Sequence, residues 1–214
     1  MTDTDDRPGL WAWFGALLYD PFLALGERRG MADRRRALLA RAEGRVLELG
    51  AGTGLNLPHY PAAVRELVLS EPEPAMRAAL ERRVARAGRA AQVVPAPAEA
   101  LPFADDSFDT ALSTWTLCSI PDVDAALREL RRVLKPGGTL HFVEHGLAPE
   151  DGVRRWQHRL EPMQKRLFGG CHLTRPTVDL LEGAGFEITE VDRYYEKGSP
   201  KVWGANSLGV ARSP

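Results

Sequence analysis

Residues 46–54, which read VLELGAGTG, constrain the fold of this chain most strongly. Three apolar residues surround Glu48 and lead into three glycines at alternate positions, Gly50, Gly52 and Gly54. An apolar run that ends in a glycine turn predicts a buried parallel strand followed by a loop. Because glycine has no Cβ, the backbone of this loop can take positive φ values and lie directly against a ligand.

A second predicted strand, residues 66–70, leads directly into Glu71. An acidic residue in this place, about 20 residues after the glycines, is where α/β nucleotide-binding folds bind ribose hydroxyls. A ligand that contacts both features would therefore carry a ribose. The dinucleotide fingerprint G-x-G-x-x-G does not fit, because Leu55 occupies the position of its third glycine.

Composition restricts the class of protein. A chain of 214 residues with 44% hydrophobic and 27% charged residues suits a single globular domain, residues 1–214. The net charge of -1 gives no electrostatic reason to expect nucleic acid as a partner. Cys118 and Cys171 are far apart and form neither a disulfide framework nor a zinc-binding pattern, so we expect no metal and a reducing, cytoplasmic location.

Strand-like and helix-like segments alternate along the chain, which predicts an α/β fold with a doubly wound, mostly parallel sheet of about seven strands and helices on both faces. Two closely spaced β runs at the end predict an antiparallel C-terminal hairpin. Residues 1–43 are expected to form a helical cap, and residues 144–176 a lid or insert. The expected helices are residues 26–42 with solvated arginines, 75–87, 122–134, 152–167 and 177–183; the remaining strands are 91–94, 107–113, 139–143, 186–191 and 203–211.

Residues 10–25 are apolar and aromatic but are interrupted by Asp20 and Pro21. The segment is too short to span a bilayer and lacks the basic region that precedes a secretion signal. We expect a helix that packs on the core or over the ligand. The alternative is weak contact with a membrane surface through Trp11, Trp13 and neighbouring apolar residues.

Several segments together resemble the class I S-adenosylmethionine (SAM) methyltransferases, a Rossmann-like family. Glu48 and the three glycines match the E-x-G-x-G-x-G of its motif I. Residues 71–76 resemble its acidic segment with a methionine, and residues 98–109 resemble its A-E-x-L-P-F…S-F-D stretch. The sequence LRELRRVLKPGG, residues 127–138, matches the helix and turn that precede the fifth strand.

The resemblance implies SAM as the cofactor and S-adenosylhomocysteine as the product. The family's aspartate that binds the adenine amino group is replaced by Pro97, so the backbone near Ala98 or the Glu99 side chain would take over that contact. The implied cofactor-binding residues are Tyr19, Glu48, Gly50, Gly52, Gly54, Asn56, Glu71, Pro72, Met76, Ala98, Glu99 and Thr114.

Three further segments, residues 116–119 (TLCS), 143–145 (VEH) and 168–175 (FGGCHLTR), resemble the methyltransferase-like group of small-molecule thiol S-methyltransferases. That resemblance implies a thiol substrate. His145 or His172 would then accept the thiol proton or stabilise the thiolate, and Trp115 would form a wall of the pocket. Either histidine could instead cap a loop or helix, and the two cysteines could be small buried hydrophobic residues.

Other functions remain open. The main alternative is a C- or O-methyltransferase that acts on a quinone, phenol or lipid, because motif I and the Lys-Pro-Gly-Gly turn also occur there. A non-catalytic module that has the SAM fold and serves as a partner is disfavoured by the intact glycines and Glu71, because a dead site would be expected to lose them. An NAD-dependent oxidoreductase is disfavoured by Leu55 and by the lack of a Tyr-x-x-x-Lys pair. The protein is expected to be a monomer or a homodimer.

Overall fold

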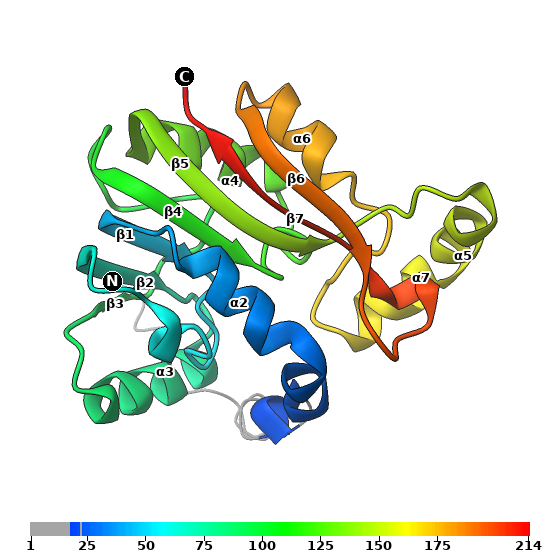
Figure 1. Ribbon diagram of the computed structural model, residues 1–214, viewed down its shortest axis with the longest axis horizontal. Coiled ribbons are helices and arrows are strands. Elements are labelled where there is room, and N and C mark those ends of the chain that lie inside the picture. Colours follow the sequence, from blue (N-terminus) through cyan, green and yellow to red (C-terminus); the bar gives the residue numbers. More distant parts are fainter. Residues whose placement is uncertain (1–17, 22) are drawn as a thin grey trace, which may run out of the picture.

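The computed structural model describes residues 18–21 and 23–214 of the chain (Figure 1). Most of the apolar segment predicted at residues 10–25 therefore lies outside the described residues, including Trp11 and Trp13. The described part, residues 18–21 and 23–26, is helical, as expected. Leu18 and Leu25 are both exposed.

A seven-stranded sheet forms the centre of the molecule, with the strand order β3-β2-β1-β4-β5-β7-β6. The strands β1 to β5 pair in parallel, whereas β7 runs antiparallel to both of its neighbours. This arrangement confirms the predicted Rossmann-like sheet with an antiparallel C-terminal hairpin. The strands are β1 (Gly44–Leu49), β2 (Val64–Ser70), β3 (Gln92–Val94), β4 (Phe108–Thr114), β5 (Leu134–His145), β6 (Glu187–Tyr195) and β7 (Ala205–Arg212).

Two of the helices, α3 and α4, begin at a side chain that caps the first turn. The Asp122 side chain accepts a hydrogen bond from the Ala125 backbone N–H at the start of α4, and Glu73 does the same for Met76 at the start of α3. From residue 27 onward the helical elements are η1 (Glu27–Met31), α2 (Ala32–Leu39), η2 (Leu57–His59), α3 (Pro74–Ala87), α4 (Val123–Val133), α5 (Asp151–Leu167), α6 (Thr177–Gly183) and α7 (Lys201–Gly204).

Two hydrophobic cores lie on opposite faces of the sheet. One contains Leu38 of α2, Leu80 of α3 and Val46 of β1. The other contains Leu130 of α4, side chains of α6 and Leu47 of β1. Successive strand residues point to opposite faces, so β1 contributes apolar side chains to both cores. Each fully buried leucine in these cores contributes about 1.5–3 kcal/mol to folding.

Some boundaries differ from the sequence prediction. Strand β5 begins at Leu134, which pairs with Phe108 before the Lys-Pro-Gly-Gly segment bulges out, and regular pairing resumes at Thr139. Strand β6 continues to Tyr195 instead of ending at residue 191, because it pairs along the length of β7. The first residues of the predicted last strand form the short helix α7 instead.

The strand order fixes where a ligand can bind. From β1 the chain proceeds to β2 and β3 on one side, and it then returns to place β4 on the other side of β1. The connections after β1 and β4 therefore lead away in opposite directions. In open α/β sheets a ligand binds in the crevice at the carboxyl ends of strands at such a reversal.

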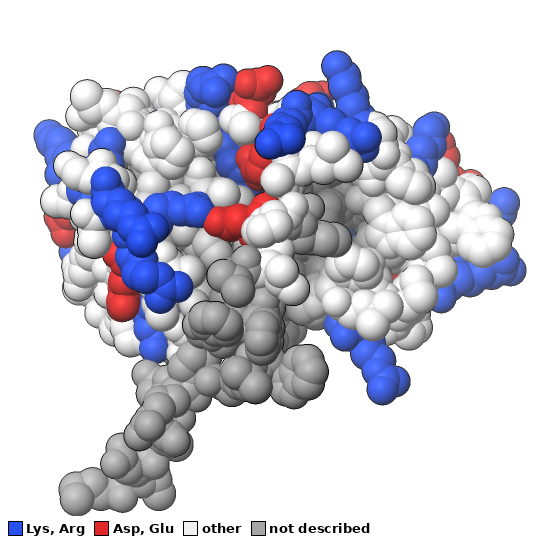
Figure 2. All heavy atoms as spheres, turned by 90° about the horizontal axis from the view of Figure 1, so that it is seen from below, with Lys and Arg blue, Asp and Glu red and all other residues white. Residues whose placement is uncertain are grey.

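The surface carries mixed charge. On the face seen in Figure 2, Lys and Arg side chains lie in several separate places with Asp and Glu side chains among them. Four of the large exposed apolar side chains lie on or next to α5: Trp156, Met163, Leu167 and Phe168. Within residues 18–21 and 23–214, no helix combines the length and apolar character that crossing a membrane requires.

Candidate active site

The glycine loop that follows β1 has a backbone that side chains would disturb. Gly50 has a φ of 54°, and a Cβ built on it would lie 2.4 Å from Cγ2 of Thr116. Gly52 has a φ of 57°, but a Cβ there would meet nothing within 4 Å among the described residues. Gly50 is therefore required for packing within the protein, whereas Gly52 faces open space in which a ligand can approach the backbone.

Glu71 lies directly beside this loop. Its carboxylate accepts hydrogen bonds from the backbone N–H groups of Gly52, at 2.8 Å, and Glu73, at 2.9 Å. Burial raises the pKa of Glu71, and these two hydrogen bonds oppose that effect. The structure thus brings together the glycine loop and the carboxylate that sequence analysis assigned to the ribose. The open space at Gly52 and the adjacent acceptor suit the expected cofactor.

A buried polar network lies below the loop. Glu48 accepts hydrogen bonds from the Tyr60 hydroxyl, at 2.5 Å, and from Nδ2 of Asn56, at 2.7 Å. The same Asn56 nitrogen donates to Oγ1 of Thr114 at 3.0 Å. Burial raises the pKa of Glu48 to about 7, although its hydrogen-bond donors favour the charged form. Three of the predicted cofactor residues, Glu48, Asn56 and Thr114, therefore form one unit.

Sequence analysis missed Arg35, which it placed among the solvated arginines of the first helix. The side chain is only 5% exposed, and its Nη1 donates to Asn56 at 3.0 Å and to Thr114 at 3.3 Å. Its Nε pairs with Glu27 at 3.1 Å. The helical spacing could have predicted this burial, because Arg35 lies three residues before the buried Leu38 and shares its helix face.

Trp115 follows β4 with a φ of 53°, a left-handed conformation that is unfavourable for a bulky side chain. Its indole N–H donates to Asn206 at 2.9 Å, and the Arg35 guanidinium carbon lies 4.7 Å from the ring centroid. The indole ring thus connects β7 to the helix α2. This places Trp115 at the predicted edge of the sheet, where it can form a wall of a pocket.

The other predicted cofactor residues are more scattered. Burial raises the pKa of Tyr19, and the charges of Arg35 and Glu71 also act on it, so its hydroxyl lies near the polar network. Met76 is half-buried in the first turn of α3, Ala98 is buried and Pro72 is exposed. Glu99 accepts a weak hydrogen bond, 3.5 Å long, from the backbone N–H of Asp122 at the start of α4.

Glu144 is fully buried and fixes the loop after β4. Its carboxylate accepts hydrogen bonds from the Ser113 hydroxyl at 2.6 Å and from the backbone N–H groups of Thr116, Leu117 and Cys118 at 3.0–3.1 Å. The side chain therefore does not bind the neighbouring His145. This agrees with the alternation of strand residues, which sends adjacent side chains to opposite faces.

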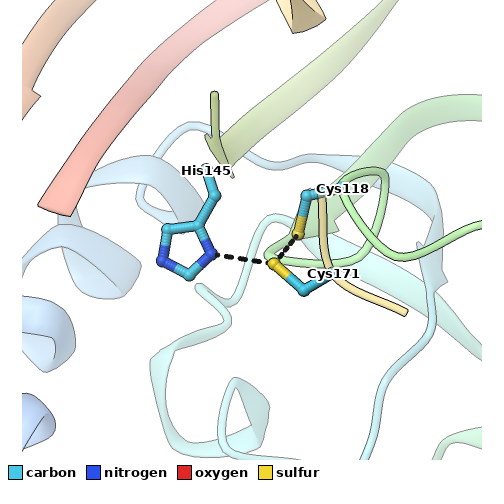
Figure 3. Close-up of side chains that lie close together, drawn as sticks. All are labelled: Cys118, His145 and Cys171. Carbon is cyan, nitrogen blue, oxygen red and sulfur yellow. Dashed lines mark hydrogen bonds between the residues drawn. The ribbon is translucent and has the colours of Figure 1, made fainter. Parts of the chain in front are cut away.

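The fold brings Cys118, His145 and Cys171 together (Figure 3). The two Sγ atoms are 3.5 Å apart, and Sγ of Cys171 lies 3.4 Å from Nδ1 of His145. The hydrogen bond between the two cysteines lowers the pKa of the Cys171 thiol and raises that of Cys118. The sequence spacing showed no metal-ligating pattern, yet the fold places three potential ligand atoms within 4.8 Å of one another. The expectation that the protein holds no metal stays a prediction.

His172 points away from that cluster. Its Nδ1 lies 2.7 Å from Oε1 of Glu161 on α5, and the other oxygen of Glu161 accepts from the Leu173 backbone N–H. This is the loop contact that sequence analysis kept as the alternative role. Arg175 likewise fixes the segment, because its guanidinium donates to the backbone carbonyls of Leu117 and Ile120.

Because the pKa of Glu48 is raised in the folded state, we expect the free energy of unfolding to depend on pH. The folded state binds this proton more tightly than the unfolded state, whose carboxyl pKa is near the ordinary 4.5. The stabilisation is complete below about pH 4.5 and is lost as pH rises through about 7, a change of about 3 kcal/mol. We expect Glu48→Gln to remove this dependence, so that its free energy of unfolding rises relative to the parent protein between pH 5 and pH 8.

Urea unfolding at several pH values measures this difference. Glu43→Gln, at an exposed glutamate, is the matched control and should follow the parent protein throughout. A difference between Glu48→Gln and the parent that stays constant with pH would contradict the assigned pKa.

Comparison with known proteins identifies the family. A family model described as a methyltransferase domain matches residues 47–142. Human thiol S-methyltransferase TMT1A is 34% identical over 195 residues, which cover 83% of this chain and 79% of that protein. Human thiol S-methyltransferase TMT1B is 36% identical over 177 residues, which cover 77% of this chain and 72% of that protein.

The fold is shared more widely. A crystal structure of a putative methyltransferase from Bacillus halodurans C-125 matches with a TM-score of 0.71 and 18% identity, covering 86% of this chain and 98% of that one. The family model, the two human relatives and the shared fold all indicate a methyltransferase. The glycine loop and Glu71 at the carboxyl edge of the sheet, which suit SAM, are consistent with that family. The chain belongs to the family of S-adenosylmethionine-dependent methyltransferases that includes the two human proteins.

Proposed function

We propose that this protein transfers the methyl group of SAM to the sulfur of a small-molecule thiol. One observation carries the proposal. The three segments that resemble the thiol S-methyltransferases, although far apart in sequence, meet at Cys118, His145 and Cys171. The printed names of the two human relatives support the same substrate class.

The residues present fit the cofactor. The backbone at Gly52 would approach it closely, Glu71 would accept hydrogen bonds from the ribose, and Glu48 with Asn56 would lie toward its methionine end. When bound, SAM supplies an activated methyl group: the thiolate sulfur bonds to the methyl carbon as the bond from that carbon to the sulfonium sulfur breaks, leaving its electron pair on S-adenosylhomocysteine. The thiol proton leaves before this step.

The chain's own task is to orient the acceptor, exclude water and stabilise the thiolate. His145 lies at the carboxyl end of β5, and its half-buried imidazole lies beside Cys171. Of the two histidines, it is the one that we place beside the acceptor sulfur, because His172 is engaged by Glu161. Trp115 would form a wall of the acceptor pocket.

We also propose that the predicted N-terminal cap, of which the structure describes residues 18–21 and 23–43, and residues 144–176 cover the site. Arg35 joins the first of these segments to Asn56 and Thr114, and Arg175 joins the second to the loop after β4. Such a cover would exclude water from the reacting sulfur.

The acceptor is tested with methyl-labelled SAM and a matched panel of an alkyl thiol, an aryl thiol, a dithiol, a catechol and a quinol. We expect label on the thiols alone. Label found on the oxygen or carbon acceptors, with none on thiols, would establish the alternative C- or O-methyltransferase.

The cofactor site is tested by Gly52→Ala. The new methyl group would occupy the open space beside the loop, so we expect the Kd for SAM to rise by about tenfold or more, which is about 1.4 kcal/mol. Gly88→Ala is the matched control, because Gly88 also has a positive φ, 65°, and open space around it but ends α3 away from the site. Calorimetric titration measures both variants, and equal SAM affinity in the two would contradict the assignment.

A further inference from the structure

We propose that Cys118, His145 and Cys171 bind a zinc ion and leave one coordination position for the sulfur of the acceptor. The metal site stands on the arrangement of these three residues alone. Its use of the fourth position rests on the proposed function, because it requires a thiol substrate.

The distances fit a tetrahedral zinc site. Zinc–sulfur bonds of about 2.3 Å and zinc–nitrogen bonds of about 2.0–2.1 Å place two sulfur ligands about 3.8 Å apart and sulfur and nitrogen about 3.5 Å apart. The observed separations are 3.5 Å between the sulfurs and 3.4 Å from Cys171 to His145. The three ligand atoms lie within 4.8 Å of one another, so a rotation of the His145 side chain that brings its ring nitrogen closer to Cys118 would let a single ion contact all three (Figure 3).

The chemistry of the donors favours the same ion. Two thiolates and one imidazole are a typical zinc set, and soft sulfur ligands discriminate against magnesium and calcium. Both cysteines are buried, with exposed fractions of 1% for Cys118 and 6% for Cys171. The burial of the two cysteines therefore limits the access of water to the ion.

The surroundings of the ligands are ordered, as metal sites require. Glu144 binds the backbone N–H of Cys118 at 3.0 Å. The Gln164 side chain forms a hydrogen bond to the Cys171 thiol, while its Oε1 accepts from the Trp203 indole N–H at 3.0 Å. Such contacts beyond the ligands orient them and tune their basicity.

The number of ligands separates two kinds of site. A structural zinc site is closed by four protein ligands, whereas a catalytic site has three and keeps one position open. In the part of the chain that the structure describes, the cluster contains three. His145 is half-buried and lies at the carboxyl edge of the sheet, the same edge as the glycine loop, so the open position can face the reacting partners.

The open position explains how the acceptor becomes a nucleophile. A thiol that coordinates zinc loses its proton to solvent, so the thiolate is present at neutral pH. The two protein thiolates already balance the charge of Zn²⁺, which leaves the third sulfur electron-rich. After that sulfur bonds to the methyl group it becomes a thioether, a weak ligand that leaves the ion.

Metal binding is measured on chelator-treated protein titrated with zinc chloride against a chromophoric chelator. We expect one zinc per chain, and we expect Cys171→Ser and His145→Ala each to weaken binding by about a hundredfold. His158→Ala is the matched control, since His158 is exposed on α5, and it should bind zinc like the parent protein. SAM affinity and thermal unfolding without zinc show whether each variant is folded.

Occupancy of the fourth position is read from the cobalt-substituted protein. Cobalt bound to thiolates has an intense charge-transfer absorption, and a third thiolate should increase it. We therefore expect an alkyl thiol to strengthen the band and the corresponding alcohol to leave it unchanged.

The outcomes separate the claims. Three results would overturn the metal site: no stoichiometric zinc binding, equal zinc affinity in all variants, or a Cys118–Cys171 disulfide in protein purified under reducing conditions. Zinc binding without a spectral response to thiols, or full thiol methylation by chelated protein, would overturn the role of the fourth position and leave the proposed function intact. Zinc binding together with methylation of quinols or phenols only would overturn the proposed function and leave the metal site.

Discussion

The buried carboxylate of Glu144 is the interaction on which the site depends. It receives the Ser113 hydroxyl at the end of β4 and three consecutive backbone N–H groups of the following loop, so this loop is attached to β5 at three points. This attachment sets the direction of Trp115 and Cys118, and the same loop supplies the Thr116 side chain that packs against Gly50. Removing the acceptor would leave several buried donors unpaired, each at a cost of about 1–3 kcal/mol.

Two polar systems of different character lie at the carboxyl edge of the sheet. One network lies next to the cofactor loop and joins a carboxylate, an amide, a hydroxyl and a guanidinium: Glu48, Asn56, Thr114 and Arg35. Cys118, His145 and Cys171 form a sulfur-rich cluster at the ends of β4 and β5. The first suits a charged ligand and the second a soft nucleophile. The strand order brings the two systems to the same edge.

The fold and half of the site could be predicted because their signals are local. Glycines at alternate positions and Glu71 at the end of an apolar run predict a cofactor-binding loop with an adjacent carboxylate, and this prediction does not depend on the rest of the sequence. Arg35 was missed because its charge suggested solvent, although its spacing from Leu38 predicted a buried face. The cluster could not be predicted, since Cys118 and Cys171 are 53 residues apart and only the tertiary fold brings them into contact. The left-handed backbone of Trp115 likewise leaves no mark in composition or periodicity.

The order of the last two strands affects how the chain folds as it is synthesised. Strand β7 follows β6 in sequence but lies between β5 and β6 in the sheet. Until β7 has left the ribosome, β6 has no partner strand and the long edge of β5 stays unpaired. An unpaired edge is a template for association with other chains. The ribosome-bound intermediate is therefore the stage at which this protein most needs protection from aggregation.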